Sequence, residues 1–140
     1  MDLVESLPYS LSEAGPAELD GVGNYYVEVL AGSGHSALTI YLLDTHSYSP
    51  DEKKFKGYDW LKKNQIEWFK ETAQGLKKGN TGYRHIHMNL AFIHIPLPEY
   101  AIATNPRKGA VREAVTAPSY NSHFRDALVE EGVVLLSCGQ

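Results

Sequence analysis

The feature that most constrains the fold of this chain is an apolar run over residues 88–95, which is typical of a buried strand. Pro96 and Pro98 follow directly and end the strand, because proline lacks the N–H group that ladder pairing requires. His94 stands at the carboxyl end of the run. Such a histidine is more often a core residue bonded to a backbone carbonyl than a ligand at the rim of a sheet.

Two segments before this run predict a β-hairpin. Residues 24–30 alternate in polarity, residues 38–43 are almost entirely apolar, and a glycine-containing turn at 32–34 separates them. Residues 60–77 are predicted to form a helix, capped by Asp59 or Asn64, because apolar side chains recur at helical spacing. That stripe consists of Ile66, Phe69, Ala73 and Leu76.

After the apolar run the pattern predicts one more helix and one more strand. The helix is expected to start at Asn121 or Ser122 and to end at Gly132, with a buried strand over residues 133–136. Residues 1–24 and 96–118 are rich in turn-forming residues and are predicted to be loops. A loop-like beginning and an end on a strand favour a chain that is part of a larger domain.

Composition excludes some classes of function. A formal net charge of −4 argues against non-specific binding of nucleic acid or of an anionic membrane. Cys138 is the only cysteine, so no intramolecular disulfide is expected. The first residues lack signal-peptide features, and no apolar run approaches the ~20 residues that span a bilayer. The default expectation is therefore a cytoplasmic location, with no membrane segment in this chain.

Asp44 and His46 form an Asp-x-His pair at the end of a predicted strand, which is one pattern of metal ligands. The interpretation favoured by the residue types is an Asx-type turn with a solvated histidine, because Asp is a common turn former.

The remaining candidates are weaker. His85 and His87 are predicted to share a strand face, and His-x-His can bind zinc, but no third ligand stands out by spacing. His35 and His123 are expected to be solvated. Surface or structural roles are expected for Glu99 and Glu113, and no sequence pattern supports Cys138 or a serine as a nucleophile.

Four stretches, long and in a fixed order, carry a resemblance to a known family. They are residues 7–16 (LPYSLSEAGP) with 20–25 (DGVGNY), residues 57–60 (GYDW) with 65–68 (QIEW), residues 91–100 (AFIHIPLPEY), and residues 112–118 (REAVTAP) with 121–122 (NS). Over nearly all of its length the chain resembles the calcineurin-like metallophosphoesterases, in their purple-acid-phosphatase-like branch of fungi and plants.

The resemblance implies an α/β fold, and residues 1–140 as the C-terminal part of a four-layer α/β/β/α sandwich. Members hold a dinuclear pair of divalent metals (Fe, Mn or Zn) and hydrolyse phosphate esters. Their ligands come in order from Asp-x-His, Gly-Asp-x-x-Asp, Gly-Asn-His-Asp, a lone histidine and Gly-His-x-His. The lone histidine corresponds to His94, whereas Gly139 would begin the last motif and Gln140 replaces its first histidine.

The order of the motifs also indicates that two patterns are look-alikes. Asp44-x-His46 follows Gly23-Asn24, which reverses the family order, and Tyr25 stands where the Gly-Asn-His motif has its histidine. The resemblance therefore implies a fragment of a metallophosphoesterase whose full domain acts on a phosphoester substrate. The fragment alone is expected to be inactive and unable to hold two metals. The alternatives are a non-catalytic binding module derived from a phosphoesterase and, less favoured, a small zinc enzyme using His85, His87 and His94.

Overall fold

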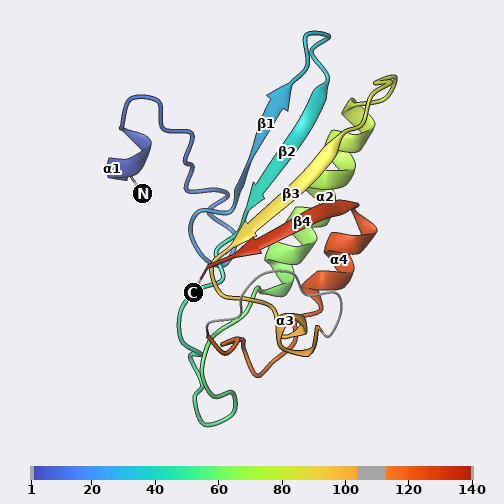
Figure 1. Ribbon diagram of the computed structural model, residues 1–140. Coiled ribbons are helices and arrows are strands. Elements are labelled where there is room, and N and C mark those ends of the chain that lie inside the picture. Colours follow the sequence, from blue (N-terminus) through green and yellow to red (C-terminus); the bar gives the residue numbers. More distant parts are fainter. Residues whose placement is uncertain (1, 104–112, 140) are drawn as a thin grey trace.

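The computed structural model describes residues 2–103 and 113–139, which form one twisted sheet with helices packed on it (Figure 1). The strands are β1 (Tyr25–Leu30), β2 (Ser36–Leu42), β3 (Met88–Ile93) and β4 (Val133–Cys138), in the spatial order β1-β2-β3-β4. β1 pairs with β2 antiparallel, which confirms the hairpin, while β2–β3 and β3–β4 are parallel pairs. The α/β class is therefore confirmed.

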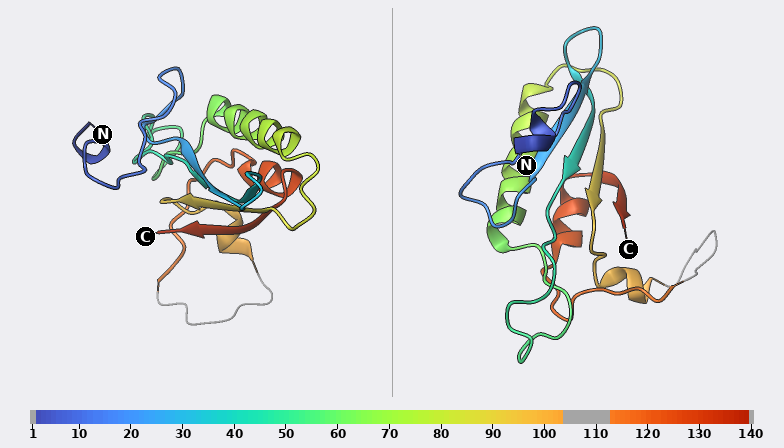
Figure 2. Two further views of the ribbon diagram at one scale, coloured as in Figure 1. Left: turned by 90° about the horizontal axis from the view of Figure 1, so that it is seen from above. Right: turned by 90° about the vertical axis from the view of Figure 1, so that its left-hand side faces the viewer.

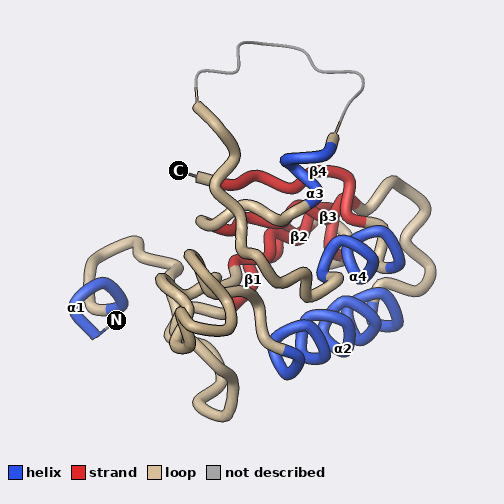
Figure 3. Tube along the Cα trace, turned by 90° about the horizontal axis from the view of Figure 1, so that it is seen from below, coloured by secondary structure: helices blue, strands red, loops and turns tan. Residues whose placement is uncertain are grey.

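The helices that connect the parallel strands lie on one face of the sheet. α2 (Lys63–Gly79) runs between β2 and β3, and α4 (Phe124–Glu130) runs between β3 and β4. Figures 2 and 3 show both helices on the same side of the sheet. This is expected of helices that connect neighbouring parallel strands and cover one face of the sheet. No helix in residues 2–103 and 113–139 has the length and apolar character needed to cross a membrane.

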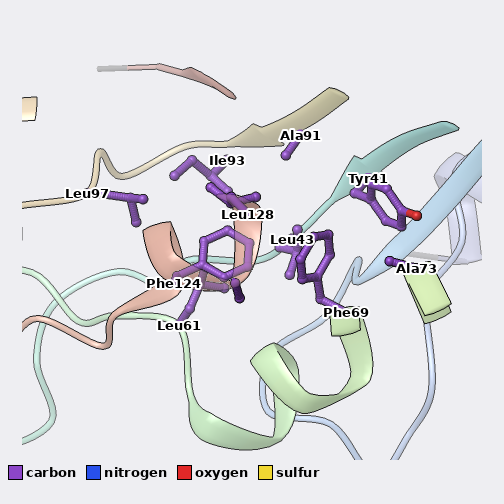
Figure 4. Packing of buried hydrophobic residues seen from close by; sticks show 11 residues of the cluster. Tyr41, Leu43, Leu61, Phe69, Ala73, Ala91, Ile93, Leu97, Phe124 and Leu128 are labelled. Atoms are coloured by element: carbon purple, nitrogen blue, oxygen red, sulfur yellow. The ribbon is translucent and has the colours of Figure 1, made fainter. Parts of the chain in front are cut away.

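An aromatic core joins these helices to the sheet (Figure 4). Tyr41 of β2 and Phe124 of α4 each meet Phe69 of α2 edge to face, with ring centroids 5.0 and 5.3 Å apart, and all three side chains are fully buried. Burial raises the pKa of the Tyr41 hydroxyl above its usual range, because the ionised form would be poorly solvated.

The opposite face of the sheet is apolar, and within residues 2–103 and 113–139 no layer of helices covers it. Successive strand residues point to opposite faces, so the neighbours of the buried core residues point away from α2 and α4. Met88, Phe92 and Leu135 are among these neighbours and are 46%, 39% and 47% exposed. The described residues thus form one helical layer and one sheet with an apolar free face, and do not themselves form a four-layer sandwich.

Both predicted helix caps are wrong. α2 has Lys62 as its N-cap, and the Gln65 side chain accepts a hydrogen bond from the Lys62 backbone at 2.8 Å. Asp59 instead pairs with the Lys62 ammonium group. α4 has His123 as its N-cap.

Local hydrogen bonding explains the second of these errors. The side chain of Asn121, one of the two predicted caps, accepts a hydrogen bond from the His123 N–H at 2.8 Å. An Asx-type turn therefore precedes α4, and the helix starts later than predicted.

Two short helices lie in segments predicted to be loops. They are α1 (Asp2–Glu5) and α3 (Glu99–Ile102), each a single turn that the sequence pattern is too short to reveal. Residues 104–112 of the predicted long loop lie outside the described residues. β3 ends at Ile93, so His94 and Ile95 lie just beyond the strand in which they were expected.

Two phenylalanines on opposite faces of the fold provide a matched test of this one-sided core. Phe69→Ala, which empties a fully buried site, should lower the free energy of unfolding by about 3–5 kcal/mol. Phe92→Ala should cost far less, because its side chain is already 39% exposed. Urea denaturation followed by tryptophan fluorescence measures both values, and equal losses would contradict the assignment of faces.

Candidate functional site

His94 lies at the carboxyl edge of the sheet, where the parallel strands β2, β3 and β4 end, and its side chain is exposed. Two hollows meet at this residue. One, of about 470 Å³, is lined by Asp44, Phe92 and Cys138 among others. The second, of about 190 Å³, includes Tyr58 and Glu113 in its lining. The carboxyl edge of parallel strands is where ligands of open α/β sheets commonly bind.

The backbone on both sides of His94 is anchored. The Ile93 carbonyl accepts a hydrogen bond from the Gly139 N–H at 3.3 Å, and the Ile95 N–H donates to the Thr45 hydroxyl at 2.9 Å. The imidazole therefore projects from a fixed stretch of chain, although the ring itself is open to solvent.

Gly139 is packed directly against the imidazole. A Cβ atom added at this glycine would lie 2.9 Å from His94 Nδ1, a distance that real Cβ contacts almost never reach. A side chain at this position would therefore displace the ring. The structure thus brings together His94 and the glycine that the resemblance matches to the start of the last metal-ligand motif.

A buried polar network holds the adjoining loops together, and sequence reasoning missed it. The Asn24 carboxamide oxygen accepts hydrogen bonds from Gln65 Nε2 at 2.8 Å and from the Asp44 N–H at 3.1 Å. Gln65 Nε2 also donates to the Asp44 carbonyl at 2.7 Å, and its Oε1 contacts His46 Nε2 at 3.0 Å. The network ties the start of β1, the end of β2 and the first turn of α2 together.

The Asp44-x-His46 pair is not arranged as a pair of metal ligands. Asp44 Oδ1 accepts a hydrogen bond from the His46 N–H and Oδ2 accepts one from the Val22 N–H, both at 2.8 Å. This confirms the Asx-type turn. The expectation of a solvated histidine was wrong, because His46 is half-buried and its ring contacts Gln65.

His85 and His87 precede β3, whereas His94 follows it. The six residues of β3 separate the two positions by roughly 20 Å at the rise of a strand, so a zinc site shared by all three histidines is excluded. His87 Nε2 lies 2.9 Å from the Thr39 hydroxyl, and the His85 ring packs against Tyr83. Both side chains line one hollow, as expected for a shared side, but they lie before the strand and not within it.

The other two histidines have local contacts. His35 stacks on Tyr83 with ring centroids 5.5 Å apart, so it is packed on one face rather than fully solvated. His123 is exposed at the start of α4, as predicted, and its Nδ1 lies 3.6 Å from the Asp126 carboxylate.

Glu99 has the structural role predicted for it, since its Oε1 accepts a hydrogen bond from Asn121 Nδ2 at 2.8 Å. Glu113 is exposed beside the smaller hollow. Cys138 lies beside Tyr100, whose hydroxyl donates to the Leu136 carbonyl at 2.7 Å. Burial, together with the Cys138 thiol, raises the pKa of Tyr100 to about 12.

The described residues do not form a metal centre. Within residues 2–103 and 113–139, no group of three or more histidine, cysteine, aspartate or glutamate side chains is placed to hold an ion. Both Asp44 oxygens already accept backbone hydrogen bonds. His94 therefore stays a predicted ligand, and Gln140, at the second position of the last motif, lies outside the described residues.

Comparisons with known proteins extend over nearly the whole chain. It is 35% identical to phosphatase DCR2 of the yeast Saccharomyces cerevisiae, over 99% of this chain and 25% of that protein. It is 34% and 31% identical to the probable inactive purple acid phosphatases 29 and 14 of Arabidopsis thaliana, each over 96% of this chain and over 38% and 37% of theirs.

These similarities support a purple-acid-phosphatase-like phosphoesterase family. The chain spans between 25% and 38% of the length of these relatives. No protein-family model matches it, and no solved structure matches it significantly. The relatives include proteins named as inactive, so the comparisons support a phosphoesterase ancestry and leave catalysis to be tested.

A sequence signal for the missed network did exist. Asn24 and Gln65 both lie in stretches that carry the resemblance, but each was interpreted by itself, as part of a turn and as a helix residue. Only the fold shows that the two side chains, 41 positions apart, bond to one another.

Two glutamines of α2 test the importance of the network. Gln65→Ala should lower the free energy of unfolding by about 1–3 kcal/mol, because it removes hydrogen bonds to the buried Asn24 side chain and the half-buried His46 ring. Gln74→Ala, which removes an exposed contact to Glu131 from the same helix, should change it by less than about 0.5 kcal/mol. Urea denaturation gives both values, and a Gln65→Ala loss as small as that expected for Gln74→Ala would show that the network is dispensable.

Proposed function

We propose that this chain is part of a metal-dependent phosphoesterase domain and contributes His94 to its metal site. The observation that carries the proposal is the position of His94, exposed at the carboxyl edge on an anchored backbone, with Gly139 closely packed against Nδ1. Similarity to a named phosphatase over 99% of the chain supports hydrolysis of phosphate esters as the reaction class.

The free face of the sheet supports the finer proposal for the fold. Phe92, Met88 and Leu135 expose apolar surface that soluble proteins normally cover. A second sheet packed on this face would bury it and would complete a four-layer α/β/β/α sandwich. The helical layer of α2 and α4 would then be one of the two outer layers.

The implied cofactor is a dinuclear pair of divalent metals, Fe, Mn or Zn, which would stabilise the charge that develops on phosphate during hydrolysis. Within the described residues the donor set does not fit such a centre, because no group of three or more histidine, cysteine, aspartate or glutamate side chains is placed to hold an ion. The remaining ligands would have to come from other parts of a longer protein. Residues 1–140 alone are therefore proposed to lack efficient phosphatase activity.

A non-catalytic binding module is the second candidate function. Two relatives that are 34% and 31% identical carry names that include the word inactive, which favours this candidate. In a module of this kind the carboxyl-edge hollows would bind a ligand without hydrolysing it.

Hydrolysis of 4-nitrophenyl phosphate tests the proposal. The 140-residue chain should show no turnover with Mn²⁺, Zn²⁺ or Fe²⁺. Fusing it to the part of the yeast phosphatase that precedes its matching segment should give turnover. His94→Ala should then reduce the rate at least about 100-fold, because even residues that only support a metal ligand contribute 10- to 100-fold.

His123→Ala is the matched control in the fusion, since this histidine is also exposed but lies at the start of α4. Turnover by the 140 residues alone that disappears in His94→Ala would overturn the fragment proposal. A folded, metal-loaded fusion without turnover would favour the binding module.

A further inference from the structure

The smaller hollow beside His94 has the features of a subsite for one flat ring. Its volume is about 190 Å³, below the range of pockets that hold drug-sized ligands. His94 lies on its lining together with Tyr58, Ile95 and Pro96. An imidazole, an aromatic ring and an apolar wall therefore surround a single small space.

Tyr58 is held in place by the loop that carries it. Its ring stacks on Tyr48, with centroids 5.3 Å apart and an interplanar angle of 13°. The two tyrosines also form a β-bridge. On either side of this bridge the Ser49 N–H donates to the Gly57 carbonyl at 2.8 Å, and the Asp59 N–H donates to the Ser47 carbonyl at 2.9 Å.

These contacts make Tyr58 a preorganised element of the hollow. Tyr48 covers one face of the Tyr58 ring, and Tyr58 also lines the hollow. Aromatic groups pair favourably in offset-stacked or edge-to-face geometry, and a ring fixed in advance loses little freedom on binding.

From this arrangement we propose that Tyr58 is a specificity-determining residue, which binds the leaving group of an aryl phosphate whose phosphoryl group lies at His94. The inference rests on the proposed function, since it requires His94 to lie at the phosphoryl site. Glu113 adds a negative charge to the lining, which disfavours a leaving group that carries an anionic substituent.

Phe92 also lines the other hollow at His94, but among the described residues no ring stacks on it, so no fixed aromatic pair borders that hollow. Its lining includes Asp44, Ser137 and the backbone around Gly23. Tyr25 also lines it, but Tyr25 contacts the Ser12 hydroxyl and is not part of a stacked pair among the ring contacts of the described residues. The aryl group is therefore assigned to the side of His94 that faces Tyr58.

Binding of two non-hydrolysable phosphonates to the fused protein, loaded with diamagnetic Zn²⁺, tests the inference by NMR. Phenylphosphonate should shift the imidazole signals of His94 and the ring signals of Tyr58, and should bind about 3- to 10-fold tighter than methylphosphonate. Tyr58→Ala should abolish this preference, and Tyr58→Phe should retain it. Tyr83→Ala, which removes a stacked tyrosine at the other end of the sheet, should also retain it.

The same experiment also tests whether the negative charge of Glu113 weakens the binding of an anionic aryl group. The probe 4-carboxyphenylphosphonate should bind more weakly than phenylphosphonate, and Glu113→Gln should reduce that difference. A preference for the phenyl group that survives Tyr58→Ala would overturn the inference, as would failure of phenylphosphonate to shift Tyr58.

The failure of this inference can be told apart from failure of the proposed function. Equal binding of the two phosphonates at His94 would refute the aryl subsite and leave the phosphoesterase proposal standing. A fused protein that neither hydrolyses 4-nitrophenyl phosphate nor depends on His94 for metal would refute the proposed function, whatever the phosphonate preference.

Discussion

The hydrogen bond between the buried side chains of Asn24 and Gln65 is the interaction on which the carboxyl edge of the sheet depends. Both residues are almost completely buried, so each polar atom needs a partner inside the protein. The pair also binds the backbone of Asp44, which fixes the end of β2 relative to the first turn of α2. Thr45, the next residue, then holds the backbone beside His94. The position of His94 thus depends on the hydrogen bond between Asn24 and Gln65, although neither residue contacts His94 directly in this chain of interactions.

The second constraint is that the sheet has a core on one face only. Phe69 and Phe124 fill the space between the helices and the sheet, whereas Phe92 points the other way and stays exposed. An apolar sheet face of this kind is a liability in water and a normal component of a layered α/β domain. Together with relatives of which this chain spans 25–38%, it supports the proposal of a domain with further layers.

Much of the fold could be predicted from the sequence, since the hairpin, both crossover helices and the central strand follow from periodicity. The helix caps could not, because Lys62 is an unusual N-cap that depends on Gln65, and Gln65 is buried by tertiary contacts. The turn at Asp44 was predicted correctly from its local chemistry. The contact between Gly139 and His94 could not be predicted, because it joins residues 45 positions apart across the β3–β4 pair.

His94 is the point at which these constraints meet: an exposed imidazole on a fixed backbone, beside a glycine that leaves it room. We propose above all that this imidazole is a metal ligand of the longer domain. Metal content of the fused protein, measured after gel filtration by inductively coupled plasma mass spectrometry, tests the claim most directly. We expect about two divalent ions per chain with His94 in place and a clear loss of bound metal in His94→Ala, with the metal content of His123→Ala unchanged. Full metal content in a folded His94→Ala fusion would contradict the proposal.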